Sequence, residues 1–210
     1  MASRLKASNG ADSESSRDSL ETADPTMTMP EFKYHRDPLQ SGSVEESDKR
    51  CRCCGNARGY IYAGPVYSEE DLDGSLCPWC IAEGTAHAKF GAIFVDEAAL
   101  PDGLPETVVD EVARRTPGYS SWQSEQWFAC CNDAMTFLEP VGIQDIRDHY
   151  RELEFSVLSN IIYDLHISGG AATRVLESLN KKSGPTAYVF QCLHCQAYRT
   201  FVDGNFDVDR

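Results

Sequence analysis

The sequence predicts an α+β fold in which cysteine knuckles and short antiparallel strands pack against several helices. Cysteines recur in Cys-x2-Cys pairs, a spacing that places two sulfurs on one side of a tight turn. Short aromatic and β-branched runs, bounded by glycine and proline, indicate brief strands. Other stretches carry apolar residues at helical spacing, with charges between them. At 210 residues and 41% hydrophobic content, the chain can form one domain or two small ones.

Two of the cysteine pairs predict a metal site. Cys51 and Cys54, and then Cys77 and Cys80, are separated by 22 residues. Gly55 follows the first pair and lets the loop turn back with a positive φ. Two such turns brought together give the tetrahedral four-sulfur cage that Zn²⁺ prefers. The alternatives are a redox dithiol, for which no thioredoxin-like βαβ pattern is found, or four buried thiols. We therefore expect zinc at this quartet.

A third pair, Cys192 and Cys195, lies between two predicted strands and needs two more ligands. Cys131 is our candidate for a further ligand, and the adjacent Cys130 is its alternative. The remaining candidates are Cys53, His87 and His194. A buried thiol at Cys131 is equally compatible with the sequence. A second zinc ion here would tie the middle of the chain to the C-terminal hairpin, whereas three ligands and an open position would be typical of a catalytic site.

The expected elements follow one another along the chain. Strands are expected at 32–34, 59–62, 188–190 and 198–201, and a polar loop at 41–50. Helices are expected from Pro105, from Ser120 or Ser121 to Cys130, over 142–155 and over 171–179, and residues 156–168 are ambiguous. Residues 50–82 form a zinc-ribbon-like unit.

The first 28 residues differ in composition from the rest. They are rich in serine, threonine, aspartate and glutamate and hold no aromatic residue. Such a segment buries too little apolar surface to offset its ordering entropy. We expect a disordered tail over 1–28 and a single zinc-binding domain over 29–210. Because no stretch reads as a secretory signal or membrane span, a cytoplasmic location without membrane contact is expected.

The chain is acidic, with a formal charge of −14. The tail holds three basic and five acidic residues, so −12 remains for the rest of the chain. This balance disfavours direct nucleic-acid binding, which needs positive charge, and favours basic partners. Asp145, Asp148 and Glu152 lie in one predicted helix and could meet such a partner, although most such charge runs are solvated faces.

No nucleophile with a matched base is found, nor a phosphate-binding glycine loop. His35, His149 and His166 lie in an aromatic strand, an acidic helix and an apolar stretch, so each is interpreted as a packing or surface residue. Trp122 and Trp127 are interpreted as filling space between helices. These observations favour a binding protein over an enzyme.

Many unusual blocks occur together and in one order. They are Pro30–His35, Cys51–Gly55, Arg58–Tyr62, Gly64–Ser68, Cys77–Gly84, Lys89–Phe90, Arg115–Tyr119, Trp122–Glu125 and Phe190–Cys195. Over about 29–203 the chain resembles the CbrC family of bacterial proteins. The resemblance implies a small bacterial cytoplasmic protein, associated with tolerance to nuclease-type bacteriocins, and brings no catalytic residue set. The tail departs from the family, which usually starts near the Phe32–Tyr34 block.

Together these features lead to one expectation and two alternatives. We expect a zinc-stabilised acidic protein that binds and neutralises a basic protein toxin, such as a nuclease. The first alternative is a metal-dependent hydrolase or nucleic-acid-acting enzyme with an open zinc site. The second is an interaction or stress protein without a toxin partner.

Overall fold

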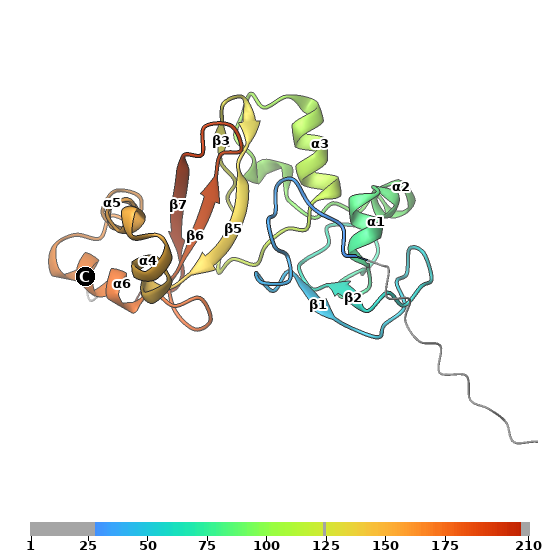
Figure 1. Cartoon of the computed structure of the whole chain (residues 1–210), viewed down its shortest axis with the longest axis horizontal. Helices are drawn as coiled ribbons and strands as arrows, with labels where there is room; N and C mark the ends of the chain where they lie inside the picture. The colour runs from blue at the N-terminus through green and yellow to red at the C-terminus, as the bar shows by residue number, and fades with distance from the viewer. Residues whose placement is uncertain (1–27, 124, 207–210) are drawn as a thin grey trace, which may run out of the picture.

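The computed structural model describes residues 28–123 and 125–206, and over these residues the fold is α+β (Figure 1). Two small antiparallel sheets pair β1 (Val44–Glu46) with β2 (Tyr60–Tyr62) and β3 (Ala129–Cys130) with β4 (Asp133–Ala134). The largest sheet is antiparallel in the order β5–β6–β7, with strands Thr136–Val141, Thr186–Gln191 and Tyr198–Asp203. The helices are α1 (Pro78–Ala82), α2 (Thr85–Phe90), η1 (Glu97–Ala99), α3 (Glu106–Arg115), α4 (Ile143–His149), η2 (Arg151–Leu153), α5 (Glu154–Tyr163) and α6 (Gly169–Ser178).

The N-terminal module, residues 28–95, carries the first two cysteine pairs. Its sheet and helices α1 and α2 lie together at one end of the molecule (Figure 1). Pro78 begins α1, where its missing N–H is of no consequence and its fixed φ suits a helix. Gly84, with φ +72°, turns the chain from α1 into α2. The core of this module includes Cys51, Cys77 and Cys80 among its buried residues, so its cysteines are part of its interior.

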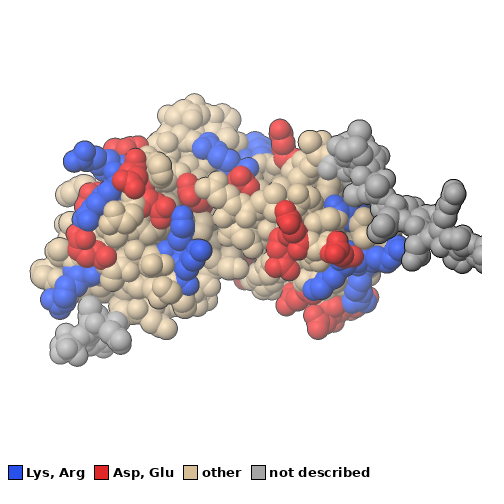
Figure 2. Space-filling model, turned by 60° about the horizontal axis from the view of Figure 1, so that its bottom comes forward, with Lys and Arg blue, Asp and Glu red and all other residues tan. Residues whose placement is uncertain are grey.

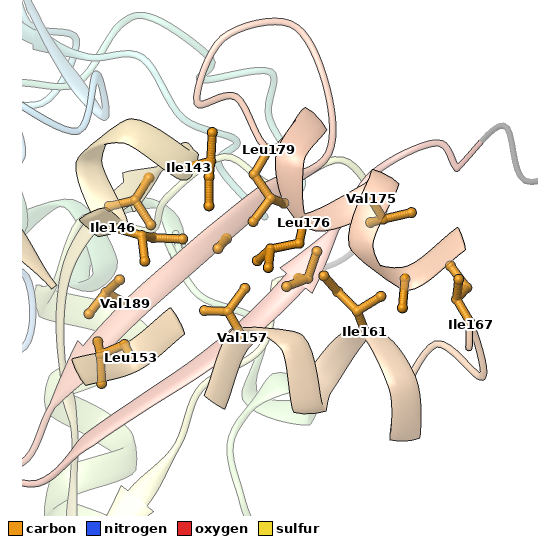
Figure 3. Close-up of a cluster of buried hydrophobic side chains, with 14 of the residues drawn as sticks. Ile143, Ile146, Leu153, Val157, Ile161, Ile167, Val175, Leu176, Leu179 and Val189 are labelled. Atoms are coloured by element: carbon orange, nitrogen blue, oxygen red, sulfur yellow. The ribbon is translucent and has the colours of Figure 1, made fainter. Parts of the chain in front are cut away.

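The C-terminal half is built on β6, whose six residues are all buried. Because strand side chains alternate, Ala187 and Val189 pack with α4, α5 and α6 on one face. Figure 3 shows this face, where Val189 lies near Leu153 and Val157. A strand covered on both faces lacks the hydrophobic–polar alternation of a half-exposed strand.

The opposite face of the sheet is aromatic. Phe190 of β6 lies 5.2 Å from Phe137 of β5 and 5.6 Å from Trp127, between ring centroids. Tyr119 stacks on Phe137 at 4.2 Å. These rings come from two strands and from the loop after α3. The aromatic cluster therefore fastens that loop to the sheet.

The predicted helix over 120–130 is wrong. The described part of this segment is irregular, with bends at 122–123, and it ends in β3. Its aromatic residues are spaced for a helix, but Trp127 is 1% exposed within the aromatic cluster, whereas Trp122 is 48% exposed and donates from Nε1 to Thr186 Oγ1 at 3.0 Å. Tertiary packing of one ring has overridden the helical pattern.

Three other predictions need correction. The strand expected at 32–34 is a turn, in which Phe32 bridges His35 and His35 bridges Phe137. The loop expected at 41–50 contains β1. The helix from Pro105, the helix over 171–179 and the three later strands are confirmed, with boundaries shifted by a few residues. The single helix expected over 142–155 is wrong: the chain leaves the helical conformation at Tyr150, whose φ is −134°, so the segment is divided into α4, η2 and the start of α5. Most of the ambiguous segment 156–168 belongs to α5.

The predicted disordered tail, residues 1–28, lies outside the described residues except for Thr28. Among the helices that the structure describes, none is both long and apolar enough to cross a bilayer.

Two candidate metal centres

The first metal centre consists of the four predicted cysteines Cys51, Cys54, Cys77 and Cys80. Their sulfur atoms all lie within 4.8 Å of one another. The Cys51–Cys80 and Cys54–Cys77 sulfur distances are 3.8 and 3.9 Å. A tetrahedral zinc ion with Zn–S bonds of about 2.3 Å places its sulfurs about 3.8 Å apart. These two distances match such an ion, and the other sulfur pairs are no more than 4.8 Å apart.

Backbone hydrogen bonds shape the loop that presents Cys51 and Cys54. Gly55 N donates to Cys51 O at 2.8 Å, and Cys51 N donates to Asn56 O at 2.9 Å. Gly55 has φ +76°, as the sequence predicts. The Cys51 sulfur also accepts from the backbone N–H groups of Cys53 at 3.4 Å and Cys77 at 3.3 Å.

These contacts favour the thiolate form of Cys51, the form in which a cysteine binds a metal. The pKa of Cys51 is lowered to about 4, first by a hydrogen bond with the Cys77 thiol and then, against burial, by backbone N–H groups. The same hydrogen bond with Cys51, and then burial, raise the pKa of the Cys77 thiol. A metal ion displaces the thiol protons when all four sulfurs bind it.

The second metal centre consists of Cys130, Cys131, Cys192 and Cys195. The sulfur of Cys130 lies 3.5 Å from that of Cys195 and 3.8 Å from that of Cys131. The three predicted ligands are brought together, and the adjacent Cys130, which the sequence leaves as an alternative to Cys131, completes the set. Four thiolate donors again match the zinc preference.

The loop at Cys192 repeats the geometry of the first knuckle. Cys192 N donates to Ala197 O at 2.8 Å, Gln196 N donates to Cys192 O at 3.1 Å, and His194 N donates to the Cys192 sulfur at 3.4 Å. The position of Gly55 is taken by Gln196, whose φ is +61°. Sequence reasoning does not detect this repeat because a non-glycine residue adopts the left-handed conformation.

Cys130 and Cys131 come from a tight β-hairpin. The helix predicted to reach Cys130 is wrong here too, because Cys130 pairs with Asp133 across β3 and β4. The two turn residues, Cys131 and Asn132, both have positive φ, of 54° and 59°. This is the pattern of a type I′ turn, which suits a two-residue hairpin. It lets the sulfurs of two successive cysteines lie in the same tetrad.

A carboxylate lies directly behind the second centre. Asp133, 6% exposed, accepts hydrogen bonds from Tyr34 Oη at 2.6 Å, Lys33 Nζ at 2.9 Å and His194 Nε2 at 2.9 Å. Burial alone would raise the pKa of Asp133, but these donors outweigh it and lower the pKa to about 2. The network joins the hairpin to the knuckle and to the N-terminal segment, independently of any ion.

The other candidate ligands lie elsewhere. His194 contacts Asp133 and is not in the tetrad. His87 Nδ1 lies 3.0 Å from Ala92 O, in the N-terminal module. The Cys53 sulfur lies 3.7 Å from Thr85 Oγ1 beside the first centre but belongs to neither tetrad. Lys89 Nζ donates to Cys53 O at 2.9 Å and so adds a positive charge beside the first centre.

The predicted partner-binding acids are not equivalent. Asp145 is half-buried at the start of α4, accepts from Gly142 N at 2.9 Å and pairs with Lys181 at 2.9 Å. Asp148 and Glu152 are exposed. Asp145 therefore caps a helix, and the other two remain available to a partner.

His35 is interpreted from the sequence as a packing residue, and it is fully buried. Its Nδ1 lies 2.8 Å from Pro117 O and its Nε2 lies 2.7 Å from Ser41 Oγ. A carbonyl oxygen only accepts, so Nδ1 carries the proton and Nε2 accepts from the serine. Burial lowers the pKa of His35 to about 4.

This burial predicts a loss of stability at mildly acidic pH. The unfolded chain takes up a proton near pH 6.5, but folded His35 does not until about pH 4, so its contribution is present above pH 6.5 and falls as pH drops. From pH 7 to 5.5 the free energy of unfolding should fall by about 1.2 kcal/mol from this residue. Urea titration of zinc-loaded wild type and His35→Gln measures it. Both proteins share the acid sensitivity of the cysteines, so an equal decline in both would contradict the prediction.

The comparisons with known proteins agree on one family. The model of the uncharacterised protein family UPF0167 matches residues 29–204. A UPF0167 protein of Pseudomonas aeruginosa is 43% identical over 169 residues, which cover 80% of this chain and 92% of the relative. UPF0167 proteins of Mycobacterium bovis and Mycobacterium tuberculosis are each 39% identical over 184 residues, which cover 87% of this chain and 97% of each relative. No solved structure shows a significant match. The chain therefore belongs to the uncharacterised protein family UPF0167.

Proposed function

We propose that this protein is a zinc-stabilised acidic binding protein that captures and neutralises a basic protein toxin, such as a nuclease. The observation that carries the proposal is the uneven distribution of charge. Residues 29–128 hold 17 acidic and 9 basic side chains, a net charge of −8, whereas residues 129–206 hold 9 and 6, a net charge of −3. The half with the first metal centre therefore carries most of the negative charge.

Two acidic segments, residues 45–48 and 69–73, account for much of this charge. All of their acidic side chains are exposed: Glu45, Glu46, Asp48, Glu69, Glu70, Asp71 and Asp73. Residues just after the first segment lie beside residues just after the second, because Arg52 N donates a hydrogen bond to Ser75 O at 2.9 Å. Of these carboxylates, only Glu70 is joined to a basic side chain by an ion pair among the described residues, at 2.8 Å from Arg52. Figure 2 shows acidic side chains at the end that carries β1 and β2, with lysine and arginine side chains among them.

The helix surface that the sequence predicts for partner binding, with Asp145, Asp148 and Glu152, has less unpaired charge than these two segments. In α4, Asp145 is paired with Lys181, and Arg147 lies between Glu154, at 3.2 Å, and Glu177. Charges that neutralise one another within the protein produce little field for a partner to follow. The segments 45–48 and 69–73 are therefore the stronger docking surface.

A zinc ion held by four thiolates adds a net −2 that the formal charge omits. It also has no free coordination position for a water molecule or a substrate. This donor set supports a stabilising metal over the alternative, a metal-dependent hydrolase. Toxin neutralisation itself comes from the resemblance to the CbrC family, whose members are associated with tolerance to nuclease-type bacteriocins.

The test measures association with the basic nuclease domain of a DNase-type bacteriocin. The association rate should be high at low salt and fall as salt rises, because steering is screened beyond about 8–10 Å at physiological ionic strength. The double variant Glu45→Lys, Glu69→Lys should lower it by roughly tenfold or more. The matched variant Asp148→Lys, Glu152→Lys, on the helix surface, should lower it less.

Lysozyme, a basic protein that is not a nuclease toxin, controls for charge alone. Equal binding to lysozyme and to the nuclease domain would reduce the interaction to non-specific attraction. Failure to bind any nuclease domain tested, or to protect cells that express one, would contradict the proposal. Zinc-dependent turnover of nucleic acid, lost in Cys195→Ser, would favour the hydrolase instead.

A further inference from the structure

We propose that the second metal centre is an exchangeable site for d¹⁰ metal ions, which fills and empties while the protein stays folded. The first centre, in contrast, keeps its ion for as long as the N-terminal module is folded. This inference is independent of the proposed function, because it concerns the two sets of cysteines and no partner.

The first argument is access. In the second centre Cys131 and Cys195 are exposed, Cys130 is half-buried and Cys192 is buried. In the first centre Cys51, Cys77 and Cys80 are at most 2% exposed and only Cys54 is half-buried. An ion leaves such a site when a competing ligand reaches it, and the shell around the site controls that access. A chelator therefore reaches the second centre first.

The second argument is what holds the sulfurs in place without an ion. Cys192 directly follows β6, which pairs with β7 over six residues and with β5 on its other side. The β3–β4 hairpin is joined to the knuckle by the Asp133–His194 contact at 2.9 Å. These supports come from the sheet and from a buried carboxylate, so the empty centre keeps its shape.

Among the described residues, the elements that support the first centre are shorter than the strands of the sheet that supports the second. The strands beside the first centre, β1 and β2, have three residues each, and α1 and α2 have five and six. Elements this short are marginal on their own. Three of its cysteines are themselves core residues. Loss of the ion would leave buried thiols at the centre of a small core, and folding and binding are therefore coupled there.

The chemistry of the site defines its ligand. Four thiolates select soft or borderline ions that tolerate tetrahedral geometry, which are Zn²⁺, Cd²⁺ and Cu⁺ among the d¹⁰ ions. Carboxylate-preferring ions such as Mg²⁺ and Ca²⁺ are disfavoured by the same donors.

The experiment uses full-length protein with two equivalents of zinc, a thiol-free reductant and an excess of the chromogenic chelator 4-(2-pyridylazo)resorcinol, without denaturant. One equivalent should be released in a fast phase and the other roughly tenfold or more slowly. Cys195→Ser should remove the fast equivalent and keep a folded protein. Cys53→Ser, which changes a cysteine outside both tetrads, should leave both phases unchanged.

A second measurement keeps the test decisive if Cys195→Ser fails to fold. Hydrogen exchange of wild-type protein stopped after the fast phase should show retained protection over 44–62, 186–191 and 198–203, with any loss of protection confined to 129–134 and 192–197. Adding Cd²⁺ alone should then refill one site. Release of both equivalents in a single phase would overturn the proposal. So would loss of protection over 44–62 when the fast equivalent leaves. A disulfide between Cys130 and Cys195 in place of the second ion would also overturn it.

Discussion

Cys77→Ser is expected to prevent the N-terminal module from folding. Cys77 is fully buried and supplies one sulfur of the first centre. It directly precedes α1, and its backbone N–H donates to the Cys51 sulfur at 3.3 Å. The apparent binding free energy of a structural zinc ion is about 10–16 kcal/mol, comparable to the whole stability of an ordinary domain at about 5–15 kcal/mol. Losing even part of this binding free energy would therefore exceed the stabilisation that so small a core can supply.

The variant should be recovered in low soluble yield, with reduced zinc content and without cooperative thermal unfolding of the module. Cys53→Ser is the matched control, since it removes a sulfur two positions from Cys51 that belongs to neither tetrad. Cys77→Ser with unchanged circular dichroism and unchanged zinc content would show that the first centre is not structural.

Phe190→Ala is expected to produce the largest effect of any substitution in the C-terminal sheet. The ring is fully buried and meets Trp127 at 5.6 Å, Phe128 at 5.3 Å and Phe137 at 5.2 Å. Truncation of a buried phenylalanine costs about 3–5 kcal/mol through lost burial and the cavity that remains. Because these neighbours come from β5 and from the loop after α3, the cavity would also loosen the loop.

Phe155→Ala is the matched control, because Phe155 on α5 is 78% exposed. Exposed substitutions of this kind usually change stability by no more than about 0.5 kcal/mol. Urea unfolding of both variants, with zinc present throughout, measures the difference. Equal destabilisation by the two changes would mean that the aromatic cluster contributes little.

The sequence predicts the first centre completely and the second only in part, for a physical reason. Both ligand pairs of the first centre have the Cys-x2-Cys spacing of a tight turn, which is a local signal. Cys130 and Cys131 are adjacent, and they serve together only because a type I′ hairpin turns both toward the knuckle. That geometry depends on positive φ at both Cys131 and Asn132; asparagine favours this conformation but cysteine does not, so the sequence signals only half of the turn.

The strands show the same division between local and tertiary information. β6 and β7 are predicted because aromatic and β-branched residues are concentrated in them. β5 is missed because it contains Glu139 and Pro140 and shifts register between Phe137 and Glu139. A proline and a charged residue argue against a strand in the sequence. The edge position of β5 in the sheet order β5–β6–β7 accommodates both.

The positions of the cysteines along the chain also set the order in which the two centres can be filled during synthesis. Cys51 and Cys80 are 29 residues apart, whereas Cys130 and Cys195 are 65 apart. The entropic costs of closing the two loops differ by only about 0.7 kcal/mol in free energy, so this term alone does not separate the filling of the two centres. The order of synthesis does separate them, because Cys80, the last cysteine of the first centre, is made 115 residues before Cys195, the last cysteine of the second. A growing chain can therefore acquire its first ion, and a folded N-terminal module, while the β6–β7 hairpin has yet to be translated.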